Sequence, residues 1–248
     1  MKSFFTYLGI QFKMDLRDRG ILMTYYLVPL LFFLVIGLVF ASVNPLMKPT
    51  LAAAMSIFAI TMGAVMGTPI PIVRARESGT LRAFRVNGIP DAAVLAVQAL
   101  SAFIHLCIVS LIIYFLSPLL LHSQIPIHPG LYFMVLVFLL ITTIGIGMLI
   151  GSVARNQSMT SMLSMIVFFP TVMLGGIMFP ASMLPKVFWI IGLLFPATHA
   201  MQAFTGLAYG TESAINPIVA LCVVIGIGVL AFTLALWRFA SRLQEERN

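Results

Sequence analysis

The feature that most constrains this chain is a set of long segments without a single Asp, Glu, Lys or Arg. Residues 21–43 and 51–73 carry no charge, and neither does the whole stretch 92–154. About 20 apolar residues are needed to cross the hydrocarbon core of a bilayer. Only 8% of the chain is charged and 61% is hydrophobic, whereas about a quarter of the residues in a water-soluble protein are charged. Lipid must therefore surround most of this chain.

These segments predict six transmembrane helices. The stretch 92–154 is too long for one helix, and a cluster of proline and polar residues between 117 and 130 divides it. The predicted spans are residues 21–43, 51–73, 92–116, 131–153, 157–179 and 214–237. Their apolar runs are too continuous for barrel strands, which alternate over about 10 residues. We therefore predict an all-α integral membrane protein that forms a single transmembrane domain, residues 1–248.

The basic residues predict how the chain is oriented. Six spans place both termini on one side, and 12 of the 14 Lys and Arg residues fall on that side, leaving Lys48 and Lys186 opposite. Because cytoplasmic loops are enriched in Lys and Arg, we expect a multi-pass protein of the bacterial cytoplasmic membrane with both termini in the cytoplasm. The basic residues sit in short loops, so the net charge of +7 does not indicate a nucleic-acid partner.

Two segments outside the spans have apolar character suited to the membrane. Within residues 1–20, four apolar side chains recur at helical spacing, which predicts an amphipathic interfacial helix: Phe5, Leu8, Phe12 and Leu16. Within residues 180–213, the apolar run 187–195 is too short to cross a bilayer at about 1.5 Å per residue. Prolines border this run, so we predict one or two short re-entrant helices that enter from the external face.

Residue types that could perform chemistry are nearly absent from the spans. The sequence shows no Gly-rich phosphate loop, no metal-ligand spacing and no nucleophile elbow, so we expect no catalytic residue, no metal site and no cofactor bound by this chain. A membrane-embedded enzyme is disfavoured for the same reason. His105 is the one histidine in a predicted span. It fits a helix-packing role, bonded to neighbouring backbone or Ser, better than the alternative, the proton relay of a proton-coupled carrier.

The cytoplasmic loop of residues 74–91 is the predicted contact for a partner. Residues 77–86 fit a short helix that Gly88 and Pro90 would end. Such a helix would present Leu81 and Phe84 as apolar anchors beside arginines, an arrangement that docks into a groove of a soluble protein. An ordinary basic loop that touches lipid headgroups explains the same residues equally well.

Small residues and prolines predict where helices approach and bend. Five glycines would let helices pack closely, as small residues do in membranes: Gly145, Gly147, Gly151, Gly175 and Gly176. The general enrichment of glycine in membrane helices explains the same residues. Pro69 and Pro71 would bend the second span just above the loop 74–91.

Three motifs together resemble a known family. Arg-Glu-Ser-Gly-Thr-Leu at 76–81 follows the second span, and Gly-Ile-Gly-Met-Leu-Ile-Gly at 145–151 leads into Arg155. Leu-Gly-Gly-Ile-Met-Phe-Pro at 174–180 precedes Met-Leu-Pro at 183–185 and Phe-Pro-Ala-Thr-His at 195–199. In this order and spacing the chain resembles the permeases of type-2 ATP-binding-cassette (ABC) exporters. The resemblance covers nearly the whole chain, although the external loops are too short for the extra domain of larger members.

The resemblance implies a permease subunit that hydrolyses no ATP itself. Two copies would form a homodimer, and two separate ATPase subunits, which carry ATP and Mg, would bind below. The implied ATPase-coupling residues are Arg76, Glu77, Ser78, Gly79, Thr80, Leu81, Arg82, Phe84 and Arg85. The implied external gate is Gly175, Gly176, Phe179, Pro180, Pro185 and Pro196.

The cargo is only weakly indicated by the sequence. A charge-free pathway rich in Phe and Met favours a hydrophobic or amphipathic molecule, such as an antibiotic, a lipid or an amphipathic peptide. A polysaccharide or lipid-linked glycan is the alternative cargo. A signalling or immunity subunit that moves nothing also fits.

Overall fold

The computed structural model describes residues 2–43, 48–179 and 183–245, and every regular element in these ranges is a helix. Six helical segments there are long and apolar enough to cross a membrane, which confirms the predicted fold class. The first five are α2–η1–α3 (Arg19–Leu22, Met23–Leu27, Val28–Val43), α4–η3–α5 (Leu51–Met62, Gly63–Gly67, Pro69–Glu77), α7 (Asp91–Leu121), α8 (Pro129–Val153) and α9 (Gln157–Leu174). The sixth is α12 (Pro217–Glu245).

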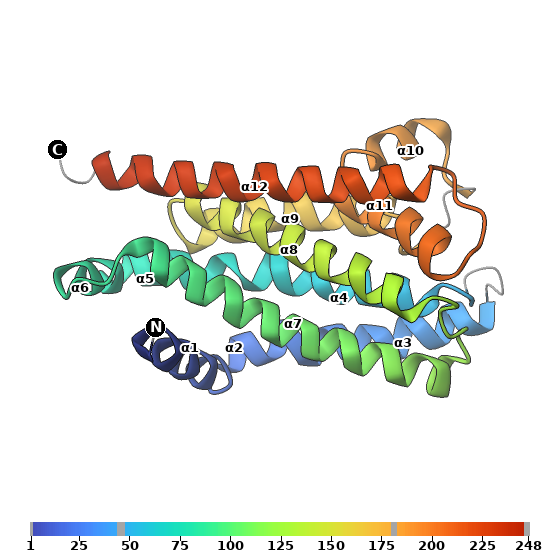
Figure 1. The fold of residues 1–248 in the computed structure, drawn as a ribbon, viewed down its shortest axis with the longest axis horizontal. Helices are drawn as coiled ribbons and strands as arrows, with labels where there is room; N and C mark the ends of the chain where they lie inside the picture. Colours follow the sequence, from blue (N-terminus) through green and yellow to red (C-terminus); the bar gives the residue numbers. More distant parts are fainter. Residues whose placement is uncertain (1, 44–47, 180–182, 246–248) are drawn as a thin grey trace.

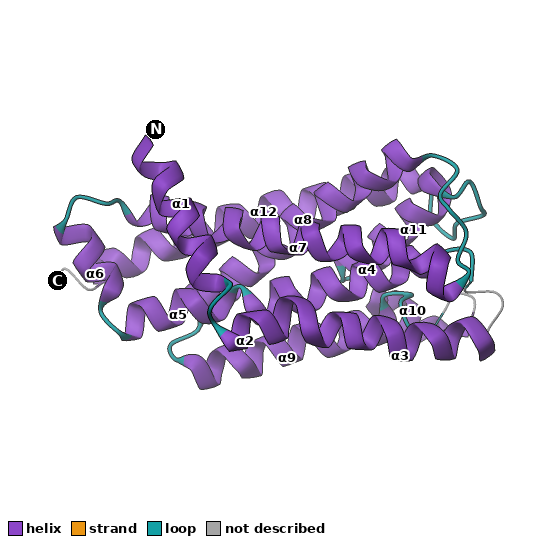
Figure 2. Ribbon diagram, turned by 90° about the horizontal axis from the view of Figure 1, so that it is seen from below, coloured by secondary structure: helices purple, strands orange, loops and turns teal. Residues whose placement is uncertain are grey.

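The shorter helices lie at the two ends of this bundle. Figure 1 shows α6 (Thr80–Val86) and both chain termini at one end, here called the α6 end. At the other end, the α10 end, lie α10 (Lys186–Gly192), α11 (Pro196–Ala203) and the connection from α7 to α8. The N-terminal helix α1 (Lys2–Asp15) runs across the long axis of the bundle and packs on α7 (Figure 2).

The second and fourth spans form the centre of the molecule. In the most apolar part of each, 89% of the residues of α4–η3–α5 and 61% of those of α8 are buried, against 22% in the first span. Small side chains let the helices approach: a Cβ at Gly147 would collide with the carbonyl of Ala64, and one at Gly145 would lie 2.8 Å from the ring of Phe232. The predicted role of these glycines in close packing is confirmed. The outer spans expose their apolar side chains, as expected for helices bathed in lipid.

Several predicted helix boundaries differ from the structure, and three of them have a clear cause or a shift at the start of the span. The third span continues through Pro118 to Leu121, because a proline in the last turn removes only one helical hydrogen bond and His122, at φ 52°, then ends the helix. The fifth span ends at Leu174 instead of residue 179, since Gly176 adopts a left-handed φ of 77°. The sixth begins at Pro217, three residues later than predicted.

The second span changes geometry close to the prolines. A π-helical turn, η3, directly precedes Pro69, and the N–H of Thr68 bonds to the carbonyl of Gly63 at 3.2 Å, five residues back. Because proline has no N–H to donate, the helix here already lacks a regular hydrogen bond. A π turn, a form typical of functional segments, therefore lies close to the prolines, and the bend expected there stays a prediction.

Candidate functional site

The loop of residues 74–91 forms a bent helical unit at the α6 end, here called the elbow. Helix α5 ends at Glu77, Gly79 takes a left-handed φ of 74°, and α6 starts at Thr80. A glycine in this conformation ends a helix because other residues are strained there. The predicted single helix 77–86 is therefore wrong at its start: Glu77 belongs to the transmembrane helix α5, and only residues 80–86 form the short helix.

Two motif residues fasten the elbow to the neighbouring connection between α8 and α9. The guanidinium of Arg76 donates to the carbonyl of Gly151 at 3.3 Å and also to that of Ala154, just past the end of α8. The carbonyls at a helix C-terminus carry a partial negative charge that favours such a cation. Gln157, at the start of α9, donates to Glu77 at 3.2 Å. Arg76 and Glu77 therefore join three spans where they meet at the α6 end.

The two predicted apolar anchors are used inside the protein. Leu81 is 6% exposed and belongs to the core, and the half-buried ring of Phe84 packs 5.5 Å from the ring of Tyr7 on α1. Both residues therefore position α6 and do not project from it, which corrects the prediction. The exposed apolar side chain is Val86, 81% accessible, with exposed Arg82 one turn before it. Sequence reasoning missed Val86; its spacing of five residues from Leu81, which puts it on another face of α6, was the available signal.

Ion pairing also ties the elbow to the N-terminal segment. The guanidinium of Arg74 lies 2.8 Å from the carboxylate of Asp18. Partial burial opposes ionisation of Asp18, but the hydrogen bonds from Arg74, Ile21 and Gly20 and the charge of Arg74 outweigh it and lower the pKa of this carboxyl. Because both side chains are partly exposed, the pair contributes little stability and acts mainly as an orienting contact.

A buried polar group, here called the Asp15 cluster, lies beside the elbow where α1 packs on α7; its members are Gln11, Asp15, Tyr26, Ser101 and His105. The Asp15 carboxylate accepts from Ser101 at 2.6 Å and from Gln11 at 2.8 Å. His105 Nδ1 bonds to the Tyr26 hydroxyl at 2.7 Å, and its Nε2 lies 3.7 Å from Asp15. Burial, reinforced by the charge of Asp15, raises the pKa of nearby Tyr7.

This cluster was only partly foreseen. His105 does pack between helices, but its partners are Tyr26 and Asp15 and not the backbone or serine that we expected. Asp15 escaped notice because it lies outside the spans. The spacing of Tyr7, Gln11 and Asp15, each four residues apart, is the signal that one polar face of α1 packs against protein. Phe5, predicted to lie on the apolar stripe, is instead 66% exposed.

The predicted gate residues lie at the α10 end but do not form one cluster. Helices α10 and the continuous segment α11–η5 (η5, Phe204–Ala208) are bent by 95° relative to each other. Gly175 and Pro196 are buried together at this corner, where a Cβ on Gly175 would lie 3.1 Å from Ala197. Phe179 is 48% exposed, and Pro185 precedes α10 on the surface. Gly176 forms the left-handed turn after α9, and Pro180 lies outside the described residues.

Side-chain hydrogen bonds hold the corner between α10 and α11. Thr198 donates to the carbonyl of Gly192 at 2.5 Å, and His199 Nε2 bonds to the carbonyl of Leu193 at 2.8 Å. These two bonds cover carbonyls at the end of α10 that the helix itself leaves unpaired. Together the two helices are apolar enough for a membrane-inserted pair.

The six-span bundle, the elbow after the second span and the bent helical pair before the last span define a class of membrane transport subunits. The chain belongs to the ABC-2 type transporter family, whose model matches residues 2–209. The match confirms the family resemblance seen in the motifs and identifies the chain as a permease-type subunit.

Two named relatives support the assignment. Over 192 residues the chain is 28% identical to the Inner membrane transport permease YhhJ of Escherichia coli (strain K12) and, equally, to the protein of the same name from Shigella flexneri. The alignments cover 74% of this chain and 50% of each relative. The chain therefore spans about half the length of the curated relatives it matches.

Proposed function

We propose that this chain is the membrane-spanning subunit of an ATP-driven exporter in the bacterial cytoplasmic membrane. Two copies pair as a homodimer, and two separate ATP-binding-cassette ATPases bind at the α6 end, which faces the cytoplasm. The positive-inside rule supports this orientation, because the loops at the α6 end carry Arg74, Arg76, Arg82, Arg85 and Arg155. The cargo is a hydrophobic or amphipathic molecule that leaves the cytoplasm or the inner leaflet.

The observation that carries this proposal is the construction of the elbow. Its outer face is exposed at Ser78, Gly79, Thr80, Arg82 and Val86. Its inner face is fixed to α8, α9 and α1 through Arg76, Glu77 and Phe84. A short helix with one exposed face, and with the other face bound to several spans, can transmit a force from a partner protein to those spans. Movement of the ATPases would thus reach the spans as a rotation of their inner ends.

The exposed face of α9 supports the cargo assignment. Its outward side chains recur at helical spacing and form one apolar stripe: Met162, Met165, Ile166, Phe169 and Met173. Methionine side chains adapt to ligands of varied shape, and only one member of the stripe is aromatic. A path lined by such a surface suits an antibiotic, lipid or amphipathic peptide better than a glycan, which favours stacking on aromatic rings.

The predicted exit lies at the α10 end. The corner between α10 and α11 combines apolar side chains with a 95° break, which supports a helical pair that dips into the bilayer from outside and returns. Helix α1 lies across the bundle axis near the elbow (Figure 2), an orientation that suits an interfacial helix on the inner leaflet.

The test replaces the exposed anchor of the elbow and leaves its buried contacts intact. Val86→Asp, alone and combined with Arg82→Glu, should abolish co-purification of an ATP-binding-cassette ATPase from native membranes, as scored by mass spectrometry. The matched control is Ile127→Asp, because Ile127 is 67% exposed at the opposite end. Normal recovery of the ATPase with the Val86→Asp, Arg82→Glu double variant would refute the coupling assignment. Leu81 is unsuitable for this test, because a charge there would disrupt the core.

A further inference from the structure

Asp15 carries a carboxylate that is buried without a permanent cation. Its side chain is 8% exposed, and within the described residues the one basic group at ion-pairing distance is His105. Arg74 is paired with Asp18, and Lys13 and Arg17 are exposed on the outside of the N-terminal segment. A buried carboxylate with hydrogen bonds but no balancing charge is unfavourable. The site is therefore one positive charge short when His105 is neutral.

His105 supplies the complementary group. The side chain is fully buried, and its Nε2 has no hydrogen-bond partner although Nδ1 bonds to Tyr26. The ring is stacked between Phe12 of α1, with centroids 4.4 Å apart, and Tyr25 of η1, with centroids 5.5 Å apart. Its free nitrogen thus faces the carboxylate from the point where α1, η1 and α7 meet.

We propose that Asp15 and His105 together bind one proton and that this proton fastens α1 to α7. With the proton on Nε2, the imidazolium donates toward Asp15 and the two charges cancel. The proton comes from a hydronium ion, whose O–H bond breaks as the Nε2–H bond forms, and it returns to water when the site is deprotonated. Burial opposes charging of the imidazole and the carboxylate favours it. Loss of the proton leaves an uncompensated carboxylate in the interface between α1 and α7.

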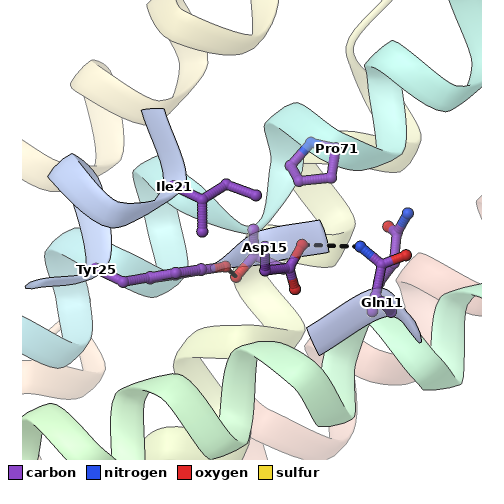
Figure 3. A pocket seen from close by; sticks show the side chains of 7 residues that line it. Gln11, Asp15, Ile21, Tyr25 and Pro71 are labelled. Carbon is purple, nitrogen blue, oxygen red and sulfur yellow. Dashed lines mark hydrogen bonds between the residues drawn. The ribbon is translucent and has the colours of Figure 1, made fainter. Parts of the chain in front are cut away.

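The remaining groups around the pair support this assignment. The other titratable or polar side chains that face it are Tyr7 and Gln11 on α1, Tyr25 and Tyr26 on η1, Gln98 and Ser101 on α7, and Thr68 before α5. None of these is cationic. A small pocket lined by Gln11, Asp15 and Tyr25 reaches the carboxylate, and Figure 3 shows Asp15 between the other two. This pocket provides a route for the proton.

Docking of α1 bears on the elbow through the contact between Tyr7 and Phe84. Protonation at the Asp15 cluster would therefore stabilise the position of α6 as well. The proton site itself concerns only α1, η1 and α7, so it stands or falls separately from the export function.

Hydrogen exchange of the full chain in lipid nanodiscs tests the inference. Backbone exchange of residues 4–15 is followed from about pH 5.5 to pH 8.5 and corrected for the intrinsic rate at each pH. One proton bound by the docked state predicts that opening of α1 increases with pH by up to about tenfold per unit as the pH rises toward the midpoint of the docked pair, and that it levels off above that midpoint. Asp15→Asn and His105→Gln should each remove this dependence.

Two further variants separate a proton site from a folding defect. Asp18→Asn removes a neighbouring carboxylate whose lowered pKa puts its titration below the tested range, so the pH dependence should remain. The double variant Asp15→Asn, His105→Gln replaces the ion pair by two neutral amides and should dock α1 without any pH dependence. A flat wild-type profile, looser docking at acidic pH, or a pH dependence that survives in either single variant would each overturn the proposal.

Discussion

The seam between α8 and α12 allows the packing of this bundle to be tested with a matched pair of glycines. Gly228 is buried against α8, and an added Cβ would lie 2.5 Å from Thr142 Oγ1 and 3.2 Å from Thr142 Cα. Gly226, two residues earlier on the same helix, is exposed, and a Cβ there meets no atom within 4 Å. Gly228→Ala and Gly226→Ala therefore add the same methyl group with and without a collision.

The expected difference follows from these contacts. Alanine favours a helix over glycine by about 1 kcal/mol, and this gain applies to both variants and cancels in the comparison. Overpacking costs about 1–3 kcal/mol. The methyl group would also disturb the hydrogen bond from Thr142 Oγ1 to the carbonyl of Val224, which is 2.9 Å long; such a bond contributes about 0.6 kcal/mol in a membrane protein. Gly228→Ala should therefore be about 2 kcal/mol less stable than Gly226→Ala.

Reversible unfolding of the purified chain in mixed micelles, followed by circular dichroism, measures this difference. In a Thr142→Ala background the Oγ1 contact is gone, so the penalty of Gly228→Ala should fall by more than half. Equal stabilities of the two alanine variants, or an unchanged penalty in the Thr142→Ala background, would refute the close approach of α12 to α8 at this seam.

Three further predictions address the elbow and the topology. Leu81→Ala should destabilise the fold by about 2–5 kcal/mol because Leu81 is buried, whereas Leu194→Ala at a 75% exposed position should have little effect in the same unfolding assay. Asp18 has a lowered pKa in the folded state, so its contribution to stability is present above about pH 4 and is lost as pH falls through the folded pKa; Asp18→Asn should flatten the acid limb of an unfolding profile by less than about 1 kcal/mol. Val86→Cys should react with an impermeant maleimide only from the cytoplasmic side and Ile127→Cys only from outside; the reverse pattern would contradict the orientation.

Span existence and span boundaries depend on different physics, and this explains which predictions were confirmed. A span requires enough consecutive apolar residues to match the bilayer, and this property can be counted in the sequence. A boundary depends on one or two backbone conformations. Gly176 could have continued the helix toward Phe179 but turns into the left-handed region instead, and α7 passes through Pro118 where the sequence suggested a break. Neither backbone conformation changes the number of consecutive apolar residues, which is the property from which the spans were predicted.

The elbow shows why its position in the chain could be predicted but not which of its side chains are exposed. Its position after the second span follows from the Arg-Glu-Ser-Gly-Thr-Leu motif. Which side of α6 is buried depends on how α1 and α7 pack against it. This packing is set by the tertiary fold and cannot be read from the local sequence. Leu81 and Val86 are both aliphatic, and only the fold decides that the first is 6% exposed and the second 81%. The proposed docking surface is therefore centred on Val86 and not on Leu81.

The charge-free spans show the same dependence on tertiary packing. Because the predicted spans contain no Asp, Glu, Lys or Arg, we expected almost no ionisable chemistry within them. This expectation holds for the residues within each span, but it does not account for side chains that other segments of the chain pack against the spans. Helix α1 packs on α7 and places Asp15 beside His105, so the packed bundle holds a buried carboxylate although none of the predicted spans contains one. A segment outside the spans can thus supply an ionisable group to them, and the pH dependence of α1 docking measures whether this group titrates.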